Sequence, residues 1–304
     1  MTASSPGADQ SAIDRPSQSE LARPSLDLGK VAYRIGFLAL LVFFTVLFVY
    51  PIVWLFSASL KPGAEVFSGD LIGSRVAWEN YGELFDRVPL ALWGWNSVYT
   101  SFLAAITVTV TSALVAFAFA YFRFPGRDLL FILVLGSMML PGAVTMIPTF
   151  LIWDFLGFNN THVPLWAGNL FASPFYIFLL RQFFLTLPRD LFDAAKVDGA
   201  GYIRMWWSIA VPLTRAALIV VFVFELKAAW TDLVKPLIFL RDVPLFTLPR
   251  GLKAVIDSPS IGGERHFELL AVGGVLVMLP MIIVFFVGQR YFIEGIATSG
   301  STGR

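Results

Sequence analysis

Six apolar stretches, separated by polar segments, run along the 304 residues of this chain. The hydrocarbon core of a bilayer is about 30 Å thick, so a spanning helix needs about 20 mainly apolar residues. Each stretch meets that length, and the fifth is interrupted by Arg215, Glu225 and Lys227. The predicted spans are residues 35–60, 97–122, 129–153, 164–183, 211–230 and 269–289. The pattern therefore predicts an all-α integral membrane protein with six transmembrane helices.

Prolines and small residues predict how these helices are shaped. A proline removes a backbone donor and favours a bend, and prolines lie within or at the ends of spans at Pro51, Pro141, Pro148 and Pro280. Ser112, Ala116 and Ala120 recur every four residues in the second span. Such a stripe lets a neighbouring helix approach closely, and we expect that neighbour to come from the same bundle.

The two ends of the chain have a different composition. Residues 1–34 are rich in Ser, Pro, Asp, Gln and Arg, which predicts a disordered cytoplasmic tail. Residues 297–304 form a second, short polar tail. A cleaved signal peptide is the competing interpretation of the first apolar stretch. That stretch exceeds the ~7–15 apolar residues of a signal peptide, and five further spans follow, so a first span is favoured.

Composition excludes several classes of function. The chain is 57% hydrophobic and 14% charged, and its 22 Lys+Arg are balanced by 21 Asp+Glu, so no basic surplus exists for binding nucleic acid. The absence of cysteine excludes disulfides, zinc-thiolate sites and thiol nucleophiles. The chain contains neither a GxxxxGK[ST] phosphate loop nor a GxSxG nucleophile motif. We therefore expect no catalytic residue, metal ligand or cofactor in this chain.

Basic residues in the connecting segments predict the orientation. Arg123 and Arg127 lie between the second and third spans, and Arg189, Lys196 and Arg204 follow the fourth. The loop at residues 154–163 contains no Lys or Arg. Because Lys and Arg favour the cytoplasmic side, both termini are expected in the cytoplasm.

The segment between the fourth and fifth spans predicts a short helix outside the membrane. Pro188 and Asp190 suit a helix start, where an acidic side chain satisfies free amides. Gly199 suits the left-handed residue that follows a helix end. A helix lying on lipid headgroups is the alternative, but such anchors carry Lys/Arg on one face and large apolar groups on the other. Alanines and aspartates fill the middle of this segment, so docking to a protein is favoured.

The same segment carries a recognisable motif. Residues Asp193-Ala-Ala-Lys-Val-Asp-Gly-Ala200, followed by Ile209-Ala-Val-Pro-Leu213, resemble the EAA motif of ABC-importer permeases. Asp193 stands for the usual Glu, and Val211 for the usual Leu. Other segments resemble the carbohydrate-importer branch, similar to the maltose-system G subunit, over about residues 30–296. They are Ser59-Leu-Lys-Pro62, Glu79-Asn-Tyr81, Arg123-Phe-Pro-Gly-Arg127, Trp230-Thr-Asp232, Thr247-Leu-Pro-Arg-Gly-Leu252 and Gln289-Arg-Tyr-Phe-Ile-Glu-Gly295.

This resemblance implies a permease domain at residues 35–296 of an ATP-driven sugar importer, most simply for a di- or oligosaccharide. It implies four partners, namely a second homologous permease, two ABC ATPase subunits that bind ATP and Mg, and an extracytoplasmic substrate-binding protein. The membrane would be a bacterial or archaeal cell membrane. The family's coupling helix, which contacts the ATPase, maps onto Asp193, Ala194, Ala195, Asp198 and Gly199.

Ionisable groups inside a membrane span are expensive and are candidates for function. Glu225, Lys227 and Asp232 are therefore candidates for the substrate pathway or for the interface with the second permease, and Lys227 favours the interface. Trp230 is a candidate for stacking on a sugar ring. These residues do not identify the sugar.

Three alternatives remain open at this point. A permease for glycerol phosphate or a polyol belongs to the same family, but an anionic ligand favours fixed positive charge and only Lys227 offers it. An ion-coupled secondary carrier would use Glu225 and Asp232. A non-transporting membrane scaffold would need neither. The last two require no ATPase-coupling helix.

Overall fold

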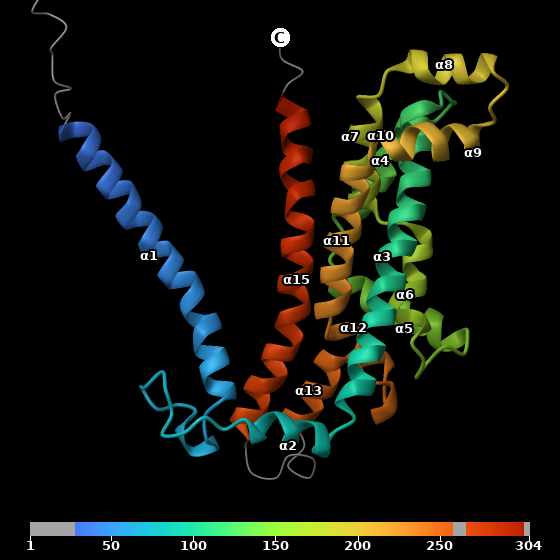
Figure 1. Cartoon of the computed structure of the whole chain (residues 1–304). Coiled ribbons are helices and arrows are strands. Elements are labelled where there is room, and N and C mark those ends of the chain that lie inside the picture. Colours follow the sequence, from blue (N-terminus) through green and yellow to red (C-terminus); the bar gives the residue numbers. More distant parts are fainter. Residues whose placement is uncertain (1–27, 258–265, 301–304) are drawn as a thin grey trace, which may run out of the picture. The chain divides into compact units, whose positions relative to one another are not determined.

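The computed structural model describes residues 28–257 and 266–300, with side chains as far as Gln289. The chain forms two compact units, residues 1–53 and 54–304. Every regular element within the described ranges is a helix (Figure 1). The predicted tails lie outside the described residues at 1–27 and 301–304.

The first unit contains most of α1 (Leu28–Ser59). This helix begins at Leu28, so residues 28–34 are helical rather than part of the predicted tail. No proline interrupts the chain between Leu28 and Tyr50, and a helix once nucleated extends at little cost. Pro51 lies inside α1. The C-terminal helix α15 (Phe267–Gly300) likewise continues through residues 297–300, which belong to the predicted second polar tail.

The second unit is built around α3 (Leu90–Tyr121), which packs against α7 (Pro174–Leu185) and α11 (Arg215–Thr231). The latter in turn packs against α15. Ser112, Ala116 and Ala120 are all buried, and the hydroxyl of Ser112 accepts a hydrogen bond from the backbone N–H of Ser173 at 3.0 Å. The expected close packing of this stripe inside the bundle is confirmed.

Three helices, α1, α3 and α15, are long and apolar enough to cross a membrane without a break. Three further pairs of helices in the described residues are apolar and long enough together to cross, but each pair is bent. α4 (Arg127–Ser137) and α5 (Gly142–Phe155) meet at 99°, the segment Val163–Phe171 meets α7 at 42°, and the segment Tyr202–Leu213 meets α11 at 83°. The described chain therefore holds up to six spans, of which the third, fourth and fifth are broken.

The breaks have local causes. Pro141 stands at the start of α5 and ends the turn that separates it from α4, as its missing N–H predicts. In the pair at the fifth predicted span, the straight helix α11 begins at Arg215, and the segment before it lies at 83° to α11. That segment consists of α9 (Tyr202–Met205), a π-helical turn η4 (Trp206–Ala210) and α10 (Val211–Leu213). Pro148 and Pro280 lie inside continuous helices.

Short elements gather at the two ends of α3 (Figure 1). At one end lies α8 (Arg189–Val197). The other end carries the short helices that lie outside the long bundle. These are α2 (Glu79–Arg87), α12 (Val234–Phe239), η5 (Val243–Leu245) and α13 (Leu248–Asp257). The short helix η2 (Gly63–Glu65) follows α1. Two more short helices, α6 (Val163–Trp166) and η3 (Ala167–Phe171), precede α7.

Candidate functional site

The predicted helix between the fourth and fifth spans is α8, and its start differs in detail from expectation. The helix begins at Arg189, and Pro188 occupies the N-cap position with an extended backbone. Asp190 lies in the first turn, but no side chain donates or accepts a capping bond there. The acidic residue therefore acts on the helix dipole rather than as a cap.

The end of α8 is a Schellman motif, as Gly199 predicts. Gly199 has a φ of 76°, in the left-handed region. Its N–H donates to the carbonyl of Lys196 at 3.0 Å, and the N–H of Ala200 donates to the carbonyl of Ala195 at 2.9 Å. Asp198 occupies the C-cap position. The backbone turns sharply at this glycine and runs back toward α9.

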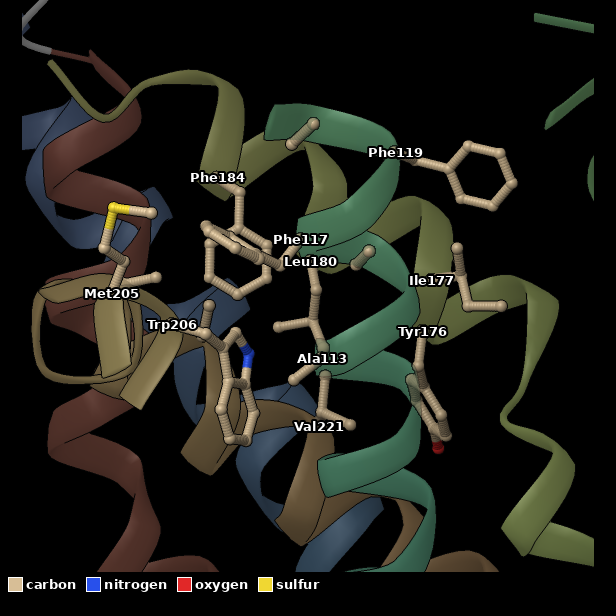
Figure 2. Close-up of a cluster of buried hydrophobic side chains, with 14 of the residues drawn as sticks. Ala113, Phe117, Phe119, Tyr176, Ile177, Leu180, Phe184, Met205, Trp206 and Val221 are labelled. Atoms are coloured by element: carbon tan, nitrogen blue, oxygen red, sulfur yellow. The ribbon is translucent and has the colours of Figure 1, made fainter. Parts of the chain in front are cut away.

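An aromatic cluster holds α8 to the end of α3. Phe192 is 3% exposed, and its ring centroid lies 5.8 Å from that of Phe117 and 5.2 Å from that of Tyr121. Phe117 also contacts Phe184 of α7 at 5.8 Å. Figure 2 shows Phe117 and Phe184 packed in the same core as Trp206. Phe192 thus fixes α8 to α3, and Phe117 of α3 in turn packs against α7.

A lysine adds a polar contact to the same attachment. The ammonium of Lys196 lies 5.2 Å from the centre of the Tyr121 ring and 3.7 Å from the carboxylate of Asp193. The neighbouring Tyr121 hydroxyl favours the charged form and raises the pKa of Lys196 above its ordinary value. The ammonium group therefore stays positive at the end of α3.

The opposite face of α8 is open. Ala194 is exposed, and Val197 is 89% exposed at the end of the helix, with Asp190 and Asp193 beside them. Ala195 is different, since it packs against the buried core. Ala195 is three residues from Phe192 and therefore lies on the same inward side, half-buried, and the docking role of the two alanines stays a prediction.

Glu225 of α11 is bonded within its own chain. Its carboxylate accepts hydrogen bonds from the Asn169 amide at 2.6 Å and from the Tyr176 hydroxyl at 3.2 Å. The same Asn169 amide donates to the carbonyl of Ala104 at 3.0 Å. Glu225 therefore joins α11 to α3, η3 and α7. Neither Asn169 nor Tyr176 was among the predicted site residues, although an Asn inside an apolar stretch is a recognisable signal.

Trp230 is part of the core. The indole is 5% exposed, and its N–H donates to the carbonyl of Val277 in α15 at 2.9 Å. The stacking of this ring on a sugar stays a prediction, and in this structure both the ring and its N–H are engaged inside the chain. Lys227, by contrast, lies on an exposed strip of α11 with Ala228 and Thr231.

Asp232 begins the turn after α11. One carboxylate oxygen accepts the backbone N–H groups of Val234 at 2.9 Å and Lys235 at 3.2 Å, which starts α12. The side chain also lines a cavity of about 10 Å³ with Thr100 and Thr247. That volume admits one water-sized group and no sugar ring.

A segment that the sequence did not single out is fixed to the far end of α3. The carbonyls of residues 243–246 are each bonded by a side chain. Trp93 donates to Val243 at 2.8 Å, and Asn96 donates to Pro244 and Phe246, both at 2.9 Å.

His162 completes this set of contacts. Its Nε2 is 2.6 Å from the carbonyl of Leu245, and Nδ1 contacts the Tyr99 hydroxyl. With Nε2–H donating to Leu245, Nδ1 accepts from Tyr99. This loop histidine is half-buried and structural. The Ser97 hydroxyl also accepts the N–H of Leu248 at 2.7 Å.

Two of the short motifs that follow α1 contact each other. The Asn80 amide donates to the carbonyls of Ser59 at 3.0 Å and Lys61 at 2.9 Å. Asn80 is 4% exposed and Lys61 is 1% exposed. The Ser59–Pro62 and Glu79–Tyr81 segments therefore form one structural unit.

Comparison with known proteins places these features in a family. The family described as binding-protein-dependent transport system inner membrane component matches residues 111–298. The arabinooligosaccharides transport system permease protein AraQ of Bacillus subtilis is 30% identical over 89% of this chain and 96% of its own length. The sn-glycerol-3-phosphate transport system permease protein UgpE of Yersinia pestis is 30% identical over 86% of this chain and 94% of its own length.

A similar fold occurs among solved structures. A chain from a bacterial ABC transporter involved in the import of the acidic polysaccharide alginate matches 89% of this chain, with a TM-score of 0.76 and 24% identity, and is covered completely. The family match extends over most of the second unit, including α8, α11 and α15. The chain therefore belongs to the inner membrane components of binding-protein-dependent transport systems, and it is a multi-pass transport subunit rather than an enzyme.

Proposed function

We propose that this chain is one permease of an ATP-driven importer for a di- or oligosaccharide in a bacterial or archaeal cell membrane. It acts with a second permease, two ATPase subunits that bind ATP and Mg, and an external binding protein. The observation that carries the proposal is α8, a short helix fixed to the bundle by Phe192 and open on its other face. Neither a carrier driven by ions nor a scaffold requires such a helix.

The exposed face of α8 forms the ATPase contact in this proposal. Ala194 and Val197 allow close approach, while Asp193 and Asp198 flank them and Gly199 sets the exit direction. Closure of two ATPase subunits on ATP would move α8 and favour the outward-facing state. A ligand shifts such an equilibrium only through different affinity for the two states, and ATP supplies that difference at the partner.

Sugar is the substrate class that the relatives favour. Two of them are permeases for arabinooligosaccharides and, in Rhizobium radiobacter, for lactose, the latter 29% identical over 83% of this chain. The Yersinia relative, for glycerol phosphate, is the reason to keep an anionic substrate as the second candidate. Lys227 is an exposed cation of α11, and it would have to carry most of the attraction for a phosphate.

The pathway residues are fewer in this proposal than the sequence suggested. Glu225 and Trp230 hold helices together within the chain, which leaves Lys227 and Asp232 as candidates for the pathway or the permease interface.

The α8 end of the bundle is cytoplasmic, together with both termini, and the 243–248 end faces the binding protein. A binding protein contacts one of the related transporters, a solved alginate importer in complex with its periplasmic protein.

The proposal is tested by purifying the tagged chain from native membranes in mild detergent and identifying each copurifying chain by mass spectrometry. A Walker-motif ATPase and a second six-span permease are the expected companions. Uptake of labelled arabinooligosaccharide, lactose and glycerol phosphate is then compared with and without the gene. A chain that purifies alone, with uptake that survives ATP depletion but collapses with an ionophore, would reject the proposal in favour of a secondary carrier.

Replacing Trp230 by phenylalanine should affect stability and leave substrate affinity unchanged. The variant loses the bond to the Val277 carbonyl, at a cost of about 1 kcal/mol, while a ring still fills the core. The thermal midpoint of the purified complex and the KM of uptake are the measurements. A raised KM at unchanged stability would contradict this structural role and support Trp230 as a residue that stacks on the sugar.

Replacing Glu225 should separate a structural role from a pathway role. Glu225→Leu leaves one N–H of the Asn169 amide and the Tyr176 hydroxyl without an acceptor, and each unpaired donor costs about 1 to 3 kcal/mol. We expect a lower thermal midpoint and less complex in the membrane. Glu225→Gln is the matched control, since an amide oxygen still accepts from Asn169, and it should assemble and transport normally. Loss of uptake in a fully assembled Gln variant would instead place the charge in the pathway.

A further inference from the structure

α3 is a continuous helix that reaches both ends of the second unit. Its 32 residues contain no proline and correspond to about 48 Å at 1.5 Å per residue. By contrast, the crossings that include α4, α7 and α11 are broken by 42° to 99°. An unbroken helix transmits displacement along its length, whereas a bend at a π-turn or proline absorbs part of it.

The C-terminal end of α3 contacts both α8 and α9, the helices that flank the turn at Gly199. Tyr121 contacts Phe192 of α8, and its ring centroid lies 6.3 Å from that of Tyr202 in α9. Phe122, the residue after α3, contacts the same Tyr202 ring at 4.9 Å. The Lys196 ammonium lies over the Tyr121 ring. A movement of α8 therefore acts directly on the side chains in the last turn of α3.

The N-terminal end of α3 binds residues 243–248 through the backbone groups of those residues. Trp93, Asn96 and Ser97 of α3 make four hydrogen bonds to it, at 2.7 to 2.9 Å. All three side chains are at most 4% exposed, so water does not compete for these bonds. The segment is thus attached to α3 more firmly than van der Waals contact alone would allow.

We infer that α3 mechanically connects α8 to the 243–248 segment, with Tyr121 and Asn96 as its positioning residues. Displacement of α8 moves the aromatic cluster, α3 carries that displacement across the membrane, and the bonds from Asn96 move the segment on the opposite side. The two residues are 25 positions apart, about 37 Å along the helix axis. The inference rests on the proposed coupling role of α8.

Single cysteine substitutions test this inference, because the natural chain contains no cysteine and each introduced thiol is therefore the one site for labelling in this chain. Val197→Cys reports on α8, where the side chain is 89% exposed, and Val243→Cys reports on the far segment, where it is 40% exposed. The full complex in lipid nanodiscs is labelled with a maleimide, with and without ATP and vanadate. We expect ATPase subunits to protect Cys at 197, and nucleotide to change the labelling rate at 243.

The connecting residues are then altered in the Val243→Cys background. Asn96→Ala and Tyr121→Leu should each abolish the response to nucleotide at 243 while protection at 197 and basal ATP hydrolysis persist. Thr109→Val is the matched control, since the Thr109 hydroxyl bonds only within α3, to the carbonyl of Ala105 at 2.7 Å. Where Asn96→Ala fails to assemble, Trp93→Phe replaces it, because it removes the bond to Val243 and keeps a ring.

The outcomes separate the inference from the function on which it rests. A wild-type nucleotide response at 243 in assembled Asn96 or Tyr121 variants would overturn the connection through α3, even with α8 docked. Failure of the ATPase subunits to protect Cys at 197 would overturn the coupling role itself. Loss of the response in Thr109→Val as well would show general softening of α3, and would also reject the specific contacts.

Discussion

Replacing Gly199 by valine should abolish uptake while the chain still accumulates in the membrane. The glycine has a φ of 76°, which a β-branched residue adopts at a cost of about 1 to 3 kcal/mol. Relief of that strain would unwind the Schellman turn and misplace the exposed face of α8. The docking-competent arrangement would then fall roughly 5- to 150-fold in population. Uptake per unit of chain on an immunoblot is the measurement, together with ATP hydrolysis stimulated by the binding protein.

Two neighbouring variants control for this result. Gly201→Ala lies two residues away with a φ of −71° and open space around its Cβ, so it should transport normally. Gly199→Asn tolerates the left-handed conformation better and should retain part of the activity. Wild-type uptake in the valine variant would show that the direction in which the chain leaves α8 does not matter for coupling.

Replacing Gly251 by alanine should sharply reduce the amount of folded chain. A Cβ at this position would overlap the indole of Trp93, which is 1% exposed and bonded to the Val243 carbonyl. A rigid ring cannot turn aside as a flexible side chain would, so overpacking should cost at least about 1 to 3 kcal/mol. The thermal midpoint of the purified complex should fall, and uptake should fall in proportion to the amount assembled.

The matched control is Gly82→Ala in α2, where nothing lies within 4 Å of the added carbon. In an exposed helix interior this change should be neutral or slightly stabilising. Normal abundance of the Gly251 variant would mean that α13 and Trp93 separate easily. That result would also weaken the contacts assigned to the outer end of α3.

The spans and α8 could be predicted because each depends on local properties of the chain. Burial in a bilayer selects about 20 apolar residues wherever they occur, and α3 covers residues 97–121 of the predicted run 97–122. Gly199 was predictable for a similar reason, since few residues other than glycine end a helix in the left-handed region. The small residues Ser112, Ala116 and Ala120 likewise reveal a packed face by spacing alone.

The roles of individual polar and aromatic residues depended on neighbours distant in sequence. Trp230 finds its acceptor 47 residues away, and Glu225 finds Asn169 at a separation of 56. Helical spacing places these side chains on a face, but it does not identify the helix that covers that face. The bend at 83° escaped prediction for the same reason, since an apolar run has the same composition whether straight or broken, whereas Pro141 indicated the break at 99°.

The attachment of residues 243–246 by their carbonyl groups has a consequence for mutation. Because the bonds go to the main chain, the side chains of these residues are not what Trp93, Asn96 and His162 recognise. Substitutions that keep the backbone path should be absorbed at the exposed Val243 and Pro244, whereas Phe246 is 3% exposed and its ring also packs against Trp93. Deleting or inserting a single residue would shift every carbonyl out of register at once and leave several buried donors unpaired. At Val243 and Pro244, chain length is therefore the property that this stretch has to keep, more than side-chain identity.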